Sequence, residues 1–200
     1  VKRQDLGHGQ AIDHCPLGDA GAGQLEGAVL RRQRVGREVG VDAVEHVRRA
    51  EHGCHLAHQA GLEAIGAGSD RTEAIAASRF EVNGLSIGFI AFDATGVAAA
   101  AGDDEAGVAT WDSEGVIGQV RGLSEDYNIL VVSVHGGTEY LPVTDPGMAA
   151  IGAELTAAGA DIVWGHGAHV VQPTKVTEAA AVVATSLGNF LFDQAGPDRT

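Results

Sequence analysis

The chain is poor in the residue types that mark several classes of protein. Its 200 residues include two cysteines, Cys15 and Cys54, which are too few for a disulfide scaffold and match no zinc motif. No apolar run approaches the ~20 residues that span a bilayer, so we expect no membrane span. No apolar stretch follows the charged start, so we also expect no signal peptide in this sequence. The 13 Lys and Arg face 27 Asp and Glu, which argues against nucleic-acid binding because neutralising phosphates needs clustered basic side chains.

The acidic residues are unevenly distributed along the chain. Residues 1–58 contain eight basic and eight acidic residues, so the segment 59–200 carries the whole net charge of −14. Six of the nine histidines also lie before residue 59. Glycines interrupt every candidate element of the first segment, which contains no run resembling the strands further on. We therefore divide the chain into a segment 1–58 and a segment 59–200.

From residue 79 onward the hydrophobic pattern alternates between predicted strands and helices. Asn83-Gly84 joins two β-prone runs and predicts a two-residue hairpin, because both residues tolerate a positive φ. Apolar spacing predicts a helix over 113–125 capped by Ser113, and a second over 145–158 that begins at Asp145-Pro146. The segment 94–110 is expected to be a mobile loop. The remaining runs predict an α/β sheet sandwich, with strands at 79–82, 85–92, 128–134, 161–164, 170–176 and 181–186.

Three histidines of the acidic segment stand where predicted strands end. His135 follows the strand at 128–134, and His166 and His169 follow the strand at 161–164, with glycines nearby. Side chains at the carboxyl ends of strands in α/β sheets line the crevice where ligands bind. Neutral imidazole is a good ligand for Mn, Fe or Zn. Each histidine alone is better explained as a polar loop residue, but the three together predict a divalent-metal site.

A metal site built on histidine also needs carboxylates and further partners. Glu139 and Asp161 are nearby candidates, although Glu139 could be solvated and Asp161 could cap a turn before its strand. A weaker alternative is a histidine tract whose spacing does not place two imidazoles on one helical face, namely His46, His52, His55 and His58.

Ordered motifs in the acidic segment resemble those of a known family. Residues 133–140 resemble the family's S-x-H-x-G-x-E-Y box, and residues 158–173 resemble its D-A-G-A-D-x-V-x-G-H-x-x-H-V-x-Q-P box. Residues 186–193 resemble the S-L-G-N-F-x-F-D part of a third box, and residues 60–70 resemble A-G-I-x-x-x-G-A-G-x-D. On these motifs, residues 59–194 resemble the CapA/PgsA-type capsule-synthesis proteins. That family is linked to poly-γ-glutamate capsule formation and is distantly related to calcineurin-like metallophosphoesterases.

The resemblance implies a four-layer α/β/β/α sandwich with a metal crevice at strand ends. It makes His135, His166 and His169 the metal positions, the same three residues that strand position indicated. It adds Glu139 and Asn189 as supporting residues and identifies no catalytic residue. It also implies a place in the cell envelope.

The chain departs from the family pattern in two places. Gly136 stands where the family usually has Trp, and Gly167 and Ala168 stand where it usually has His and Pro. The family's upstream Gly-Asp and Asn-Asn-His motifs have no counterpart in residues 1–58. That segment is therefore either divergent or the product of a shifted reading frame, and we favour the shifted frame because charge, histidine use and strand content change together. Translating the encoding DNA in its other two frames tests this choice.

Three functions remain open from the sequence. The first is a metal-dependent phosphoesterase-like protein of capsule biosynthesis. The second is a non-catalytic component that binds capsule-synthesis proteins or an anionic polymer. The third is an inactive fragment without a complete site.

Overall fold

The computed structural model describes residues 53–54 and 56–189. Most of the segment 1–58 lies outside the described residues, including His46, His52 and His55 of the histidine tract. Among the residues described, no helix is long and apolar enough to cross a membrane.

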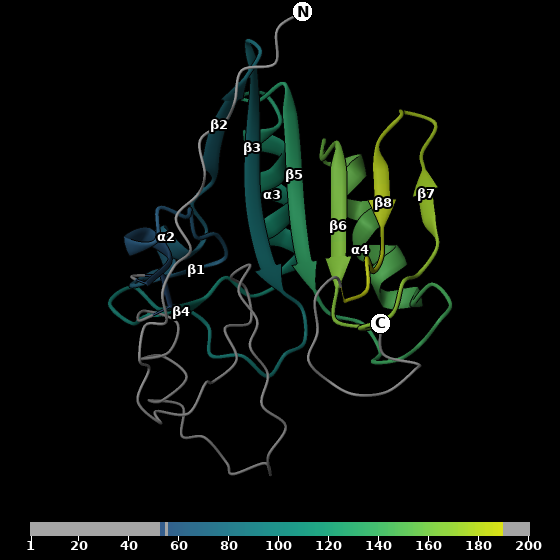
Figure 1. Cartoon of the computed structure of the whole chain (residues 1–200), viewed down its shortest axis with the longest axis horizontal. Coiled ribbons are helices and arrows are strands. Elements are labelled where there is room, and N and C mark those ends of the chain that lie inside the picture. Colours follow the sequence, from purple (N-terminus) through teal and green to yellow (C-terminus); the bar gives the residue numbers. More distant parts are fainter. Residues whose placement is uncertain (1–52, 55, 190–200) are drawn as a thin grey trace, which may run out of the picture.

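The centre of the fold is a six-stranded mixed sheet with strand order β2-β3-β5-β6-β8-β7 (Figure 1). Strands β3 (Leu85–Asp93), β5 (Ile129–His135), β6 (Ile162–His166) and β8 (Val182–Ala184) run parallel. The outer strands β2 (Ser78–Val82) and β7 (Thr174–Val176) pair antiparallel to their neighbours. The predicted hairpin between β2 and β3 is confirmed, since Asn83 and Gly84 have φ values of 52° and 82°.

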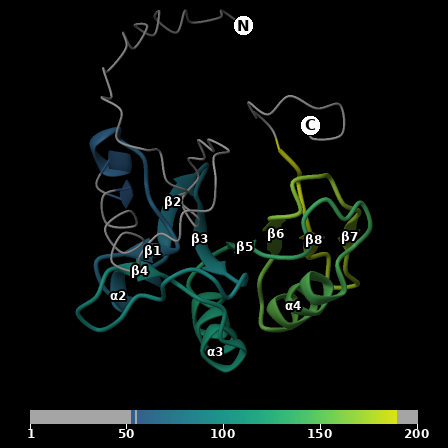
Figure 2. The same cartoon turned by 90° about the horizontal axis from the view of Figure 1, so that it is seen from below.

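Two helices connect the parallel strands and cover the same face of the sheet (Figure 2). Helix α3 (Ser113–Leu123) lies between β3 and β5 in the chain, and α4 (Pro146–Ala157) lies between β5 and β6. Asp145 caps α4 and Pro146 opens it, as predicted. The predicted cap of α3 was wrong by one residue: Asp112, with an extended backbone, accepts a hydrogen bond from the Gly115 N–H, and Ser113 begins the helix.

The apolar core lies between the sheet and these helices. Alternate residues of β5, such as Leu130 and Val132, are fully buried there against side chains of α3 and α4 such as Val120 and Leu155. Burying one such side chain stabilises the fold by roughly 1.5–3 kcal/mol. The predicted α/β class is confirmed, and the helices and sheet described are consistent with one half of an α/β/β/α sandwich.

A second, two-stranded sheet lies on the side of the large sheet where β2 is the outer strand (Figure 1). It pairs β1 (Ala67–Gly68) with β4 (Gly107–Val108), and the short helix α2 (Arg71–Ala74) packs next to it. The predicted loop over 94–110 contains no other named helix or strand, but the prediction missed β4 at its end. The alanine- and glycine-rich sequence gave no signal for β4, because two residues are too few to show a side-chain periodicity.

Candidate functional site

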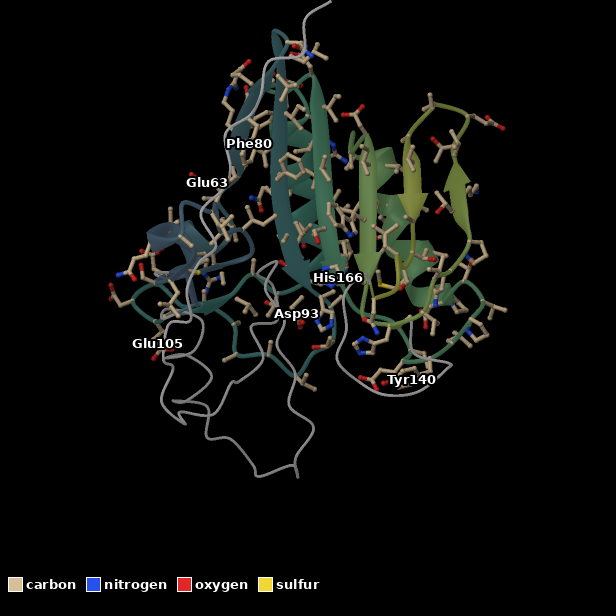
Figure 3. All side chains as sticks on the ribbon, in the orientation of Figure 1. Glu63, Phe80, Asp93, Glu105, Tyr140 and His166 are labelled. Carbon is tan, nitrogen blue, oxygen red and sulfur yellow. The ribbon has the colours of Figure 1, made fainter. Side chains whose placement is uncertain are left out.

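Three polar residues form a row across the carboxyl edge of the large sheet. Asp93, His135 and His166 are the last residues of β3, β5 and β6, and they are direct neighbours in the strand register. Side chains alternate along a strand, and the residues just before them (Phe92 and Val134) point into the helix-covered core. The row therefore lies on the sheet face opposite the helices, with Asp93 and His166 close together at the strand ends (Figure 3).

Asp93 holds His135 through a buried hydrogen bond. The Asp93 Oδ2 lies 3.0 Å from His135 Nδ1, and the side chains are 0% and 6% exposed. The other carboxylate oxygen of Asp93 accepts hydrogen bonds from the N–H and the hydroxyl of Thr95. Burial raises the pKa of Asp93, but the hydrogen bonds from His135 and Thr95 outweigh it and hold the pKa below its usual value. The carboxylate is thus ionised and fixed by partners at both oxygens.

His135 and His166 stack on each other. Their ring centroids are 5.1 Å apart with the planes 22° from parallel. His166 Nε2 lies 3.0 Å from the Ser133 hydroxyl, which is on the same face of β5 as His135. Each of the two imidazoles therefore has one nitrogen tied to a side chain of the sheet.

His169 is the centre of a separate group. Its Nδ1 lies 3.3 Å from Asn189 Oδ1, and its Nε2 lies 3.6 Å from the carboxylate of the largely exposed Glu139. The Tyr140 ring packs 5.6 Å from the imidazole. Both predicted supporting residues thus meet His169. His169 and Tyr140 also share a left-handed backbone, with φ values of 61° and 57°, which is costly for residues other than glycine.

The two site loops approach each other at a pair of glycines. The Gly136 N–H donates a hydrogen bond to His166 O at 2.8 Å. A Cβ at Gly167, where φ is 125°, would lie 2.5 Å from Gly136 O. The two positions that depart from the family pattern are therefore in contact, and only the absence of a side chain at Gly167 permits this approach.

Asp145 anchors the loop that follows His135. One carboxylate oxygen accepts hydrogen bonds from the N–H and hydroxyl of Thr138, and the other accepts from the N–H groups of Gly147 and Met148 at the start of α4. The hydrogen bonds from Met148 and Thr138 hold the pKa of Asp145 below its usual value against the opposing effect of burial. The helix start and the Glu139 loop are thus held by one carboxylate.

One sequence candidate lies at the wrong end of the sheet. Asp161 precedes β6, and its carboxylate accepts a hydrogen bond from the Leu130 N–H at 2.8 Å. The amino ends of parallel strands lie opposite the site, so Asp161 has a structural role and is no candidate ligand. The alternative interpretation, in which Asp161 bonds to the backbone before its strand, is therefore the better one.

Sequence reasoning missed Asp93. It follows the apolar run 85–92 just as His135 follows 128–134, so the same strand-end rule would have found it. A carboxylate at a strand end occupies the same kind of position as a histidine there, and Asp93 contacts His135 for that reason.

The donor types suit a divalent metal ion, but the ligand set is incomplete in the described part of the chain. No three His, Cys, Asp or Glu side chains among residues 53–54 and 56–189 are placed to hold one ion. His135 and His166 adjoin each other, His169 is held by Glu139 and Asn189, and the Asp93 oxygens are engaged by His135 and Thr95. The described residues therefore fit part of a metal site.

The site motifs belong to a stretch that matches a known family. The family described as "Bacterial capsule synthesis protein PGA_cap" matches residues 50–194, which is more than half of the chain. The chain belongs to the PGA_cap family. The residues of the three histidine and asparagine motifs all lie inside the matched stretch.

Two curated relatives carry capsule names. This PGA_cap chain is 34% identical over 135 residues to "PGA biosynthesis protein CapA" of Bacillus subtilis (strain 168), covering 66% of the chain and 35% of that protein. It is 30% identical over 141 residues to "Capsule biosynthesis protein CapA" of Bacillus anthracis, covering 68% of the chain and 34% of that protein. The chain thus spans about a third of the length of these two relatives.

A solved structure shows a weaker likeness to this PGA_cap chain. The crystal structure of a hypothetical protein from Thermus thermophilus matches with a TM-score of 0.38 and 18% identity, covering 56% of this chain and 38% of that one. A likeness at this level supports no conclusion about function.

Proposed function

We propose that the protein acts in capsule biosynthesis of the poly-γ-glutamate type and binds a divalent metal ion, Mn, Fe or Zn, at the carboxyl edge of its sheet. His135, His166 and His169 are the proposed metal positions, with Glu139 and Asn189 in support. The capsule role rests on family membership and on the names of the two relatives.

The observation that carries the metal proposal is the meeting of distant motifs at one edge. His135 and His166 come from two different motifs and are 31 positions apart in the chain, yet the strand register makes them direct neighbours with ring centroids 5.1 Å apart. The third motif contributes Asn189, which contacts His169. Clustering imidazoles on one edge serves no purpose in packing the apolar core, which lies on the other face of the sheet.

A bound divalent ion would supply Lewis acidity and lower the pKa of coordinated water. The chain's own residues do the rest. His135 and His166 would hold the ion through ring nitrogens, and the contact between Gly136 and Gly167 would bring their two loops together. His169, the third proposed metal position, would be kept in place by its contacts with Glu139 and Asn189.

A non-catalytic role in capsule assembly is the second candidate. It is favoured by the absence, within the residues that the structure describes, of three side chains placed around one point. Direct binding of an anionic polymer is disfavoured, because a net charge of −14 repels a polyanion unless cations bridge the two. In this role the protein would bind capsule-synthesis proteins, or bind the anionic polymer through metal ions.

Metal content tests the first candidate directly. The purified 200-residue chain is dialysed against Mn²⁺, Fe²⁺ or Zn²⁺ in turn, and bound metal is measured by mass spectrometry. We expect about one or more ions per chain, lost in His135→Ala and in His166→Ala. The matched control is His58→Ala, which removes an exposed histidine of the alternative N-terminal tract.

The outcomes separate the candidates. Retention of metal in both site variants, or its loss in His58→Ala alone, would remove the strand-end site from consideration. Turnover of a generic phosphate monoester by the metal-loaded chain, abolished in His135→Ala, would identify an enzyme. Metal binding without turnover would favour the assembly role.

A further inference from the structure

The two stacked histidines are held by partners of different chemistry. Asp93 contacts Nδ1 of His135, and Ser133 contacts Nε2 of His166, each at 3.0 Å. An ionised carboxylate only accepts hydrogen bonds, whereas a hydroxyl both donates and accepts. The two partners therefore restrict their histidines to different degrees.

The carboxylate leaves His135 a single neutral tautomer. Because Asp93 can only accept, its bond requires a proton on Nδ1 of His135. Thr95 holds the second carboxylate oxygen through its N–H and hydroxyl, so the carboxylate cannot rotate away without breaking two further hydrogen bonds. A metal ion can then bind His135 only at Nε2, whatever else that atom contacts.

The hydroxyl leaves His166 a choice. Ser133 can donate to an unprotonated Nε2 or accept from a protonated one without moving its oxygen. The Ser133 bond is therefore compatible with His166 carrying its single proton on Nε2, which leaves Nδ1 as the acceptor nitrogen, or on Nδ1, which leaves Nε2 as the acceptor. The fixed imidazole and the adjustable imidazole lie in direct register on adjacent strands.

We propose that Asp93 is a positioning residue that fixes His135 with its proton on Nδ1 and directs Nε2 to the ion, while the Ser133 hydroxyl by itself imposes no tautomer on His166. The part of this inference that concerns the ion rests on the proposed function. The part that concerns the tautomers holds for the metal-free protein.

The experiment compares Asp93→Asn with wild type in the full 200-residue chain. The change is isosteric but replaces an acceptor with an amide that also donates, so His135 loses the requirement for a proton on Nδ1. Nitrogen-15 NMR of histidine-labelled, metal-free protein reads the tautomer of each ring. We expect one His135 tautomer in wild type and a mixture in Asp93→Asn, with His166 changed only in Ser133→Ala.

Titration calorimetry with Zn²⁺ and, separately, Mn²⁺ provides the second readout. We expect Asp93→Asn to weaken binding by about 10- to 100-fold, the usual effect of losing such an outer partner of a ligating histidine. The matched control is Asp161→Asn, the same change at the opposite edge of the sheet, which should alter the affinity by no more than about twofold because distant sites act independently.

Failures of the two proposals are distinguishable. If wild type binds neither ion but Asp93→Asn still mixes the His135 tautomers, the metal site fails and the positioning role stands. If His135 keeps its Nδ1 proton in Asp93→Asn, the positioning role is overturned. Should Asp93→Asn fail to fold, the wild-type spectrum still tests the role: a neutral His135 with its proton on Nε2, or a mixture of the two tautomers, would overturn it.

Discussion

The two edges of the large sheet use the same polar residue types for opposite purposes. At the amino edge, Asp161 accepts from the Leu130 N–H and Asn128 accepts from the Ser86 N–H, so side chains satisfy backbone groups. At the carboxyl edge, Asp93 bonds the His135 ring with one oxygen, while its other oxygen accepts from the N–H and hydroxyl of Thr95. Polar groups bonded to the backbone stabilise the fold, whereas polar groups bonded to one another hold a geometry that a ligand can use.

Asp145 combines both purposes at the carboxyl edge. It caps α4 through the N–H groups of Gly147 and Met148, as an amino-edge residue would, and it also bonds the Thr138 hydroxyl in the loop after His135. The edge that carries the site therefore also has its own structural support.

The largest expected effect comes from Gly165→Ala in β6. A Cβ at this position would overlap the backbone carbonyl of Thr185 just after β8, so the two strands would have to separate. We expect a loss of at least about 3 kcal/mol in the free energy of unfolding, because backbone atoms cannot yield as a flexible side chain does. Urea denaturation measures it. Gly118→Ala on the exposed side of α3 is the control and should stabilise by roughly 0.5–1 kcal/mol, since nothing lies within 4 Å of its Cβ.

Removing Asp145 should have an intermediate effect that depends on pH. Asp145→Ala should lose about 1–2 kcal/mol of unfolding free energy at pH 7, from the lost helix cap and loop anchor. Because the folded-state pKa is lowered, the stabilisation is present above the unfolded pKa of about 3.9 and disappears as the pH falls through the lower folded value.

Denaturation curves at several pH values between neutrality and strong acid check the direction. The difference between wild type and Asp145→Ala should shrink as the pH falls through this window. A difference that stays constant, or that grows with acid, would contradict the role given to the ionised carboxylate.

The smallest expected effect concerns His169, where two substitutions separate the cost of its left-handed backbone from the contribution of its imidazole ring. His169→Gly and His169→Ala both remove the contacts to Asn189 and Glu139, but only glycine accepts a φ of 61° without cost. We expect the glycine variant to be more stable than the alanine variant by roughly 1 kcal/mol. Thermal unfolding of the pair measures it, and equal stability would mean that the loop relaxes to another backbone conformation.

Much of the fold was predictable because its signals are local. The Asn83-Gly84 hairpin, the Asp145-Pro146 helix start and the apolar run of β5 each depend on neighbours in the sequence. Strand β4 was missed because its pairing with β1 joins residues about forty positions apart, and neither two-residue strand has a periodic pattern.

The sequence predicted which residues belong to the candidate site, but not which of them contact one another. Strand position and the family motifs both indicated His135, His166 and His169. Which of them meet depends on strand order and register, and these place His135 beside His166 while His169 turns to Asn189. The same register brings Asp93 to His135 and carries Asp161 to the far edge, which no spacing along the chain reveals.

The strand register has a consequence for how this protein can change through evolution or design. Asp93, His135 and His166 share a face because each occupies a position of the right parity in its own strand. Insertions in the connections before β5 or β6 leave this parity intact. A single inserted residue within β5 would turn His135 toward the apolar core, whereas two would return it to the outer face. The row of Asp93, His135 and His166 therefore tolerates a change of length between the strands but not an odd number of residues added within one.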